Sequence, residues 1–73
     1  MEKLEIKERF GNNLYKIIEK RGLSCKDVAK ALGLSNERMV YAYCDTHDLR
    51  MPSIEKLKLL KDLLNVSLDD LMA

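Results

Sequence analysis

Apolar residues recur every three or four positions along most of the chain, which is the spacing of a helix face. In the first segment this spacing joins Phe10, Leu14, Ile17 and Arg21. The apolar positions of the later segments are Val28, Ala29 and Leu32, then Met39 and Ala42, and then Ile54, Leu57, Leu60 and Leu64. No segment shows the apolar–polar alternation of a half-buried strand. The pattern therefore predicts an all-α chain.

Helix-capping residues divide the first half of this pattern. Ser24 is expected to cap the second helix, and Asp27, three residues later, completes a capping-box pair. Gly33 is expected to end that helix, because glycine readily adopts the left-handed conformation. Ser35 is predicted to cap a third helix that runs to about residue 44.

The same reasoning places the other helix ends. Gly22 stops the first helix, and residues 1–7 either extend that helix or fray. Pro52-Ser53 begins a fourth helix, which Asn65 ends. Ser67 caps a short fifth helix, which we expect to be barely anchored because the chain stops just after it. With 73 residues, the chain has room for one domain over 1–73 with one modest core.

Two helices joined by a short turn with a glycine form a helix-turn-helix unit, here over residues 24–44. Ala29 is small enough to let the third helix cross the second closely, and Leu34 is expected to insert into the core. Met39 and Ala42 would hold the third helix from beneath, and Tyr43 would lie in the core or at its edge. The side chains left on the outer side are Asn36, Glu37, Arg38 and Tyr41.

In this layout "KRGLS", "DVAKALGLS" and "PSIEKLKLLKDLLNVSLDDLM" follow one another with a characteristic spacing. Their order resembles the Cro/phage-repressor (XRE-type) helix-turn-helix domains over residues 10–72. The resemblance implies a compact five-helix, lambda-repressor-like fold. It also implies binding in the major groove of double-stranded DNA, usually as a homodimer on a palindromic site.

The resemblance implies roles for individual residues. Candidate base contacts are Asn36, Glu37, Arg38 and Tyr41. Candidate phosphate contacts are Cys25, Lys26, Lys30 and Arg50. Asn36 could bond adenine and Arg38 guanine, or both could be solvated residues on an exposed helix. Tyr41 could pack on a thymine methyl group or bond a phosphate, or it could be a partly buried aromatic residue beside the first helix.

Several features favour an alternative, in which the scaffold is a protein-protein interaction module with weak or no DNA binding. The net charge is only +1, and Cys25 stands where the family usually has a phosphate-binding glutamine. Asp45 and Asp48 accompany Arg50 in a lengthened loop, and acidic groups near phosphates are unfavourable. The apolar residues that lie off the predicted core stripe, and could contact a protein partner, are Tyr15, Ile18 and Leu59.

The chain has two cysteines and one histidine. Cys44 and His47 have the spacing of half a zinc site, but tetrahedral zinc needs four ligands, so no metal is expected. Cys25 begins a predicted helix, whose dipole would lower the pKa of its thiol. It is therefore either a redox switch on the DNA face or a plain surface thiol.

No nucleophile has a base within plausible reach, so the chain is not expected to be an enzyme. No cofactor or small-molecule ligand is expected, because the domain is too small for a ligand pocket beside its core. A charged N-terminus and the lack of a long apolar run argue against a membrane protein and favour the cytoplasm. The leading hypothesis is a sequence-specific transcriptional regulator that represses by occupying a promoter.

Overall fold

The computed structural model describes residues 3–73, and this part of the chain contains five helices and no strand. The helices are α1 (Lys3–Lys20), α2 (Cys25–Ala31), α3 (Arg38–Cys44), α4 (Ile54–Leu64) and α5 (Leu68–Met72). The predicted all-α class is therefore confirmed for the described residues. Within the uncertain segment 1–7, residues 3–7 are helical and continue into the rest of α1, whereas residues 1 and 2 lie outside the described range.

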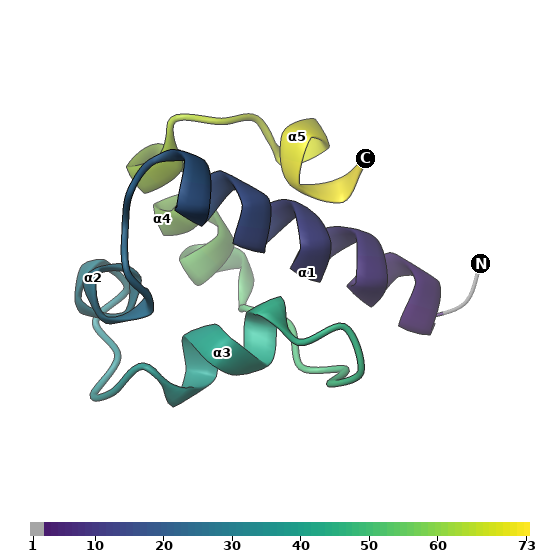
Figure 1. The fold of residues 1–73 in the computed structure, drawn as a ribbon, viewed down its shortest axis with the longest axis horizontal. Helices are drawn as coiled ribbons and strands as arrows, with labels where there is room; N and C mark the ends of the chain where they lie inside the picture. Colours follow the sequence, from purple (N-terminus) through teal and green to yellow (C-terminus); the bar gives the residue numbers. More distant parts are fainter. Residues whose placement is uncertain (1–2) are drawn as a thin grey trace.

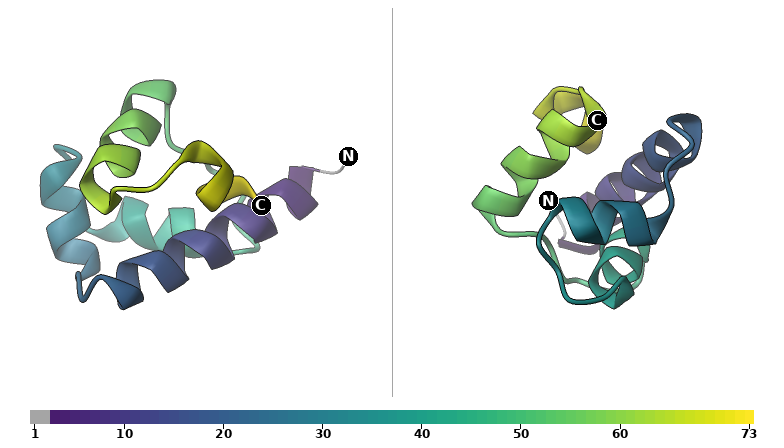
Figure 2. Two further views of the ribbon diagram at one scale, coloured as in Figure 1. Left: turned by 90° about the horizontal axis from the view of Figure 1, so that it is seen from above. Right: turned by 90° about the vertical axis from the view of Figure 1, so that its left-hand side faces the viewer.

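The long helix α1 is the element around which the others are arranged (Figure 1). It packs against α3 on one side and against α5 on another, and α2 packs against both α3 and α4. In the left view of Figure 2, α1 runs along one edge of the molecule and the other four helices lie on the same side of it. The radius of gyration is 11.1 Å, which is close to the value of about 11 Å for a compact domain of this length.

The core joins residues that are distant in the sequence. Phe10 and Leu14 from α1 are fully buried, as are Val40 from α3, Leu60 from α4 and Leu71 from α5. Tyr43 is also buried, as predicted. Because each of α2, α3 and α5 has at most seven residues, none would be stable as an isolated helix in water. Packing in this common core therefore holds them in place.

Three helices end with the same backbone device. Gly22, Gly33 and Asn65 have positive φ angles of 68°, 73° and 55°. The next residue in each case donates its N–H to a carbonyl five positions back, in the pairs Leu23–Ile18 (3.1 Å), Leu34–Ala29 (2.9 Å) and Val66–Lys61 (3.1 Å). Each apolar residue that follows the turn is half-buried against the core. These are Schellman-type ends, and they confirm the three predicted helix stops.

Serine caps begin three of the helices, as predicted for Ser24 and Ser67, and Ser53 caps the helix that Pro52-Ser53 was predicted to begin. The hydroxyl oxygens of Ser24, Ser53 and Ser67 each accept a backbone N–H three residues later. Ser35 was predicted to do the same, and this was wrong. Residues 35–37 form a turn, α3 begins at Arg38, and the Asn36 Oδ1 accepts the Arg38 N–H at 2.9 Å. A short asparagine side chain competes here with helix formation, so the helix starts later than the serine suggests.

Two residues occupy the opposite environment from the predicted one. Ile18 was placed off the core stripe, but only 4% of it is exposed. α1 packs against both α3 and α5, so its buried face is wider than a single stripe, and Ile18 belongs to the core cluster. Ile54 was placed on the apolar face of α4, but 87% of it is exposed. It is the first residue of α4, and no neighbouring element covers it.

The last helix is anchored more firmly than expected. Leu71 is fully buried, and α5 packs against α1. The Asn13 side-chain amide of α1 also donates to the carbonyls of Leu71 at 3.0 Å and Ala73 at 2.8 Å. This amide satisfies carbonyls at a helix end that have no partner within the helix. The expectation of a barely anchored α5 was therefore wrong.

Candidate functional site

The α2–turn–α3 segment presents most of the predicted contact residues. Ser24 and Asp27 form a reciprocal capping box at the start of α2, with both bonds at 3.1 Å. Ala29 is 3% exposed and faces the core, so α3 approaches α2 closely. Gly33 reverses the chain, and half-buried Leu34 ties the turn to the core. The predicted capping box, buried Ala29, turn at Gly33 and inserted Leu34 are therefore present, whereas the predicted cap at Ser35 is not.

The four candidate base-contact residues lie at and just before the start of α3. Asn36 and Arg38 are exposed, Tyr41 is 56% exposed, and Glu37 is half-buried. The exposure of Tyr41 favours a contact role over the alternative of a partly buried aromatic residue beside the first helix. Because Asn36 Oδ1 already accepts the Arg38 N–H, its Nδ2 amide is the end left to bond an external group.

A hollow of about 410 Å³ lies between α2 and the turn that precedes α3. Its walls bring two candidate phosphate contacts next to two candidate base contacts. The lining residues are Lys26, Ala29, Lys30, Leu34, Ser35, Asn36 and Glu37. Two lysines, one amide and one carboxylate thus surround an apolar floor. The two ammonium groups could attract an anion, and the carboxylate partly offsets them.

Cys25 does not have the properties expected of a reactive thiol. It is half-buried against the core, and this burial raises the pKa of the thiol, with a further contribution from the Glu37 carboxylate. The predicted lowering of its pKa by the helix dipole was therefore wrong. Burial disfavours the charged thiolate, and α2 has only seven residues. The structure favours a plain thiol over a redox switch.

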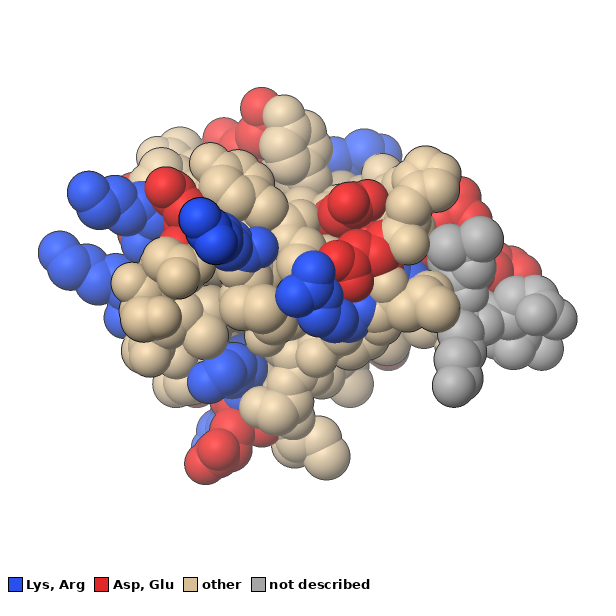
Figure 3. Space-filling view, turned by 90° about the horizontal axis from the view of Figure 1, so that it is seen from below, with Lys and Arg blue, Asp and Glu red and all other residues tan. Residues whose placement is uncertain are grey.

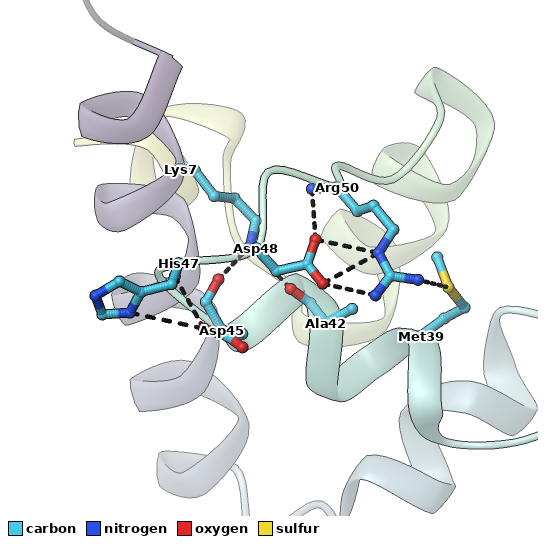
Figure 4. A network of polar contacts seen from close by, with 7 residues as sticks. All are labelled: Lys7, Met39, Ala42, Asp45, His47, Asp48 and Arg50. Atoms are coloured by element: carbon cyan, nitrogen blue, oxygen red, sulfur yellow. Dashed lines mark hydrogen bonds and ion pairs between the residues drawn. The ribbon is translucent and has the colours of Figure 1, made fainter.

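Arg50, a candidate phosphate contact, is already paired (Figure 4). Its guanidinium donates to both Asp48 carboxylate oxygens, with the shortest bond at 2.6 Å, and to the Met39 sulfur at 3.7 Å. The hydrogen bonds from Arg50 lower the pKa of Asp48 to about 2, and the same pair raises the pKa of Arg50. The charge of Arg50 is therefore compensated within the loop.

One residue of this region was missed by the sequence reasoning. Lys7 of α1 is only 1% exposed, and its Nζ donates to the carbonyls of Ala42 at 2.9 Å and Asp45 at 2.5 Å (Figure 4). Burial lowers the pKa of Lys7, while the nearby Asp48 and Asp45 carboxylates oppose this shift. The sequence contained one signal of this burial, because Lys7 lies three residues before Phe10 and so shares its helix face.

The surface on the α3 side carries charges of both signs (Figure 3). Lysine and arginine side chains project mainly on the left, the side where α2 lies in Figure 1, and apolar or neutral surface separates them. Acidic groups lie close to some of the basic ones on this face. Folding therefore does not gather the basic residues into one continuous positive patch there.

The residues considered for a metal are not brought together. In residues 3–73, no group of three or more histidine, cysteine or acidic side chains could hold a metal ion. Both thiols are free, and burial raises the pKa of Cys44 to about 11. The exposed His47 ring instead lies 3.4 Å from the Thr46 hydroxyl and 4.0 Å from the Asp45 carboxylate.

None of the helices in residues 3–73 combines the length and the apolar character needed to cross a membrane. Comparison of the chain with models of protein families, with curated proteins and with solved structures found no match. A functional assignment therefore depends on the residues of this chain and on their geometry.

Proposed function

We propose that this chain is a sequence-specific DNA-binding protein with a lambda-repressor-like fold, in which α2 and α3 form a helix-turn-helix. The observation that carries the proposal is the exposure of Asn36, Arg38 and Tyr41 along one short stretch, beside Lys26 and Lys30 on α2. Amide, guanidinium and phenol groups can bond base edges in a major groove, and lysines can bond phosphates. The resemblance to Cro/phage-repressor domains supports the same conclusion.

In this proposal α3 enters the major groove, and two copies bind the two halves of a palindromic site about one DNA turn apart. The protein acts as a repressor by occupying a promoter and excluding polymerase. Electrostatic attraction is weak, because the net charge is +1 and Arg50 is paired with Asp48. Binding then depends on base contacts more than on phosphate contacts, and nonspecific affinity is low.

The test is selection of bound fragments from a random duplex library, followed by fluorescence anisotropy of the selected sequence at several salt concentrations. A single enriched palindrome is expected. Arg38→Ala should weaken binding to it by about 1–3 kcal/mol and relax specificity at one position. Lys30→Ala should weaken binding to all sequences and make the salt dependence shallower.

Lys58→Ala is the matched control, because it removes the same charge from an exposed position on α4. It should change neither specificity nor the salt dependence. Asp45→Asn should tighten binding without changing the preferred sequence, because it removes a negative charge near phosphates. Glu37→Gln removes the same charge but should change the preferred base at one position, because Glu37 is a candidate base contact. If no sequence is enriched even at low salt, the proposal is wrong.

A protein-interaction module is the second candidate, and a specific surface favours it. Ile6, Leu49 and Met51 line a hollow of about 320 Å³ between α1 and the loop before α4, and between 36% and 56% of each residue is exposed. Tyr15 and Leu59 are also exposed, as the sequence suggested, whereas Ile18 is buried and cannot contribute. If the library selection enriches no sequence, the surface formed by Ile6, Leu49 and Met51 becomes the candidate site for a protein partner.

A further inference from the structure

Lys7 is a charged residue whose side chain is almost completely removed from solvent. Among the polar and charged residues of the described chain, Lys7 alone is buried, with 1% of its surface exposed. It lies one turn before Phe10 on α1. Removing an ammonium group from water is unfavourable unless other groups solvate it. Its two hydrogen bonds to backbone carbonyls provide this solvation.

The two carbonyls belong to the end of α3. Ala42 lies in the last turn, and Asp45 is the residue that caps the helix. The last carbonyls of a helix have no partner within it and carry the negative end of the helix dipole. The Lys7 ammonium group therefore gives the Ala42 carbonyl a partner and adds a second donor to the Asp45 carbonyl, which also accepts the Asp48 N–H at 3.4 Å.

Gly11 extends the same contact by one turn of α1. A Cβ atom built on Gly11 would lie 2.9 Å from the carbonyl oxygen of Cys44 and 3.4 Å from that of Tyr43. The backbones of α1 and α3 therefore touch at this point. Lys7 and Gly11, four residues apart on one helix face, together meet the four successive carbonyls of residues 42–45.

Asp45, whose carbonyl accepts from Lys7, is also the first residue of the loop that follows α3. The Asp45 side chain accepts the His47 N–H at 2.8 Å, and the paired Asp48 and Arg50 reach back to Met39 on α3 (Figure 4). The loop is thus folded on itself at Asp45 and attached to α3 through Met39, while Lys7 ties the last turn of α3 and the first residue of the loop to α1. A rotation of α3 about its axis would break these contacts.

We propose that Lys7 is a positioning residue that sets the orientation of α3, and thereby of Arg38 and Tyr41, relative to the rest of the domain. This inference rests on the proposed function, because it concerns the accuracy with which α3 meets DNA. Base contacts require correct orientation of their side chains, whereas attraction to phosphates tolerates small rotations. Loss of the Lys7 contacts should therefore reduce specific binding more than nonspecific binding.

The test compares Lys7→Met with Lys7→Arg. Methionine keeps an apolar stem of similar length but donates no hydrogen bond, and arginine keeps the charge and the donors. Lys16→Met, an exposed position on the same helix, is the matched control. Circular dichroism shows whether each variant is folded, and anisotropy gives its affinity for the selected duplex and for a random one.

Lys7→Met should lose at least about tenfold in affinity for the selected duplex, which is the effect of losing one base contact. It should lose much less for the random duplex. Lys7→Arg should recover most of the loss, and Lys16→Met should behave as wild type. Equal losses on both duplexes, or wild-type specificity in Lys7→Met, would show that Lys7 serves packing alone and would overturn the proposal.

A second measurement needs neither DNA nor the Lys7→Met variant, which could be destabilised. NMR of the wild-type protein should detect the protected Lys7 ammonium group and its scalar couplings to the carbonyl carbons of Ala42 and Asp45. Lys7→Arg should shift the backbone amide signals of α3 and of residues 45–51 but leave those of α4 unchanged. Absence of the couplings, with no selective shift, would contradict the inference.

Failure of the proposed DNA binding and failure of the inference about Lys7 give different experimental results. If wild type selects no duplex, the proposed function fails by that result alone, and the positioning of DNA contacts fails with it. The NMR couplings then still decide whether Lys7 holds the end of α3. If wild type selects a duplex and Lys7→Met keeps full specificity, the proposed function stands and the inference about Lys7 is wrong.

Discussion

Arg50 and Asp48 show how a neighbour two residues away changes what a charged side chain can do. An unpaired arginine in the loop after α3 would be a natural phosphate contact, and the sequence suggested that role. In the structure, both Asp48 oxygens accept from its guanidinium. Exposed ion pairs of this kind contribute little stability. The main effect of the pair is to reduce the charge that Arg50 offers to a polyanion.

This pair makes stability depend on acidic pH. The pKa of Asp48 is lowered from 3.8 to about 2 in the folded chain, so its contribution is present above about pH 4 and is lost as the pH falls through about 2. Asp48→Asn should therefore lower the free energy of unfolding at pH 7, and its difference from wild type should shrink between pH 4 and pH 2. Urea denaturation across this range measures the difference.

Asp62→Asn removes the same charge from an exposed position on α4 and is the control. Its difference from wild type should stay nearly constant over the same pH range. A difference for Asp48→Asn that is as large at pH 2 as at pH 7 would contradict the assigned role of the pair.

At the scale of single elements, the two serines that flank α2 behave differently. Ser24 and Ser35 each follow a leucine and precede a helical pattern, so the sequence predicts a cap at both, with a capping-box partner only for Ser24. Ser24 forms its capping box with Asp27, whereas Asn36 bonds the Arg38 N–H and shifts the start of α3 past Ser35. α3 therefore begins at Arg38 without a side-chain cap, which leaves Asn36 in the turn and Glu37 at the N-cap position.

A matched pair of substitutions tests this difference. Ser24→Ala should lower the free energy of unfolding by about 1 kcal/mol, the usual effect of losing an N-cap. Ser35→Ala should change it by less than about 0.5 kcal/mol, as for an exposed residue without a structural bond. Urea denaturation at neutral pH measures both. An equal loss in the two variants would mean that Ser35 caps α3 after all.

At the scale of the whole molecule, α1 connects the candidate contact surface to the C-terminal helices. Lys7 and Gly11 meet the end of α3, while Asn13 and the core side of α1 hold α5. The shortest helix, α5, is thus part of the same core as α3. We expect the domain to unfold cooperatively, as small single domains usually do.

Leu71→Ala tests this cooperativity. The side chain is fully buried, so its truncation should cost about 2–5 kcal/mol. That is a large part of the total for a chain of 73 residues, since domains are stable by roughly 0.05–0.15 kcal/mol per residue. Amide hydrogen exchange should show α1, α3 and α5 losing protection together.

Leu68→Ala, at a position of α5 that is 46% exposed, is the control and should cost less than about 1 kcal/mol. If Leu71→Ala removes protection from α5 alone and leaves α3 as protected as in wild type, α5 is not part of the cooperative unit.

The sequence by itself determined the features that depend on neighbours within a few residues. Helix content follows from apolar spacing, and the helix ends at Gly22, Gly33 and Asn65 follow from their backbone preferences. The capping boxes at Ser24 and Ser67 depend on a residue three positions away. Such interactions form in the same way wherever the segment lies in the fold, so a local pattern is sufficient to predict them.

Only the tertiary structure decided the burial of Lys7 and Ile18, the exposure of Ile54 and the raised pKa of Cys25. Each depends on which helix lies opposite the residue, and the opposing helices come from distant parts of the chain. Lys7 meets carbonyls 35 and 38 positions away, and Asn13 meets carbonyls 58 and 60 positions away. Desolvation and hydrogen bonding at such distances arise only once the helices have packed.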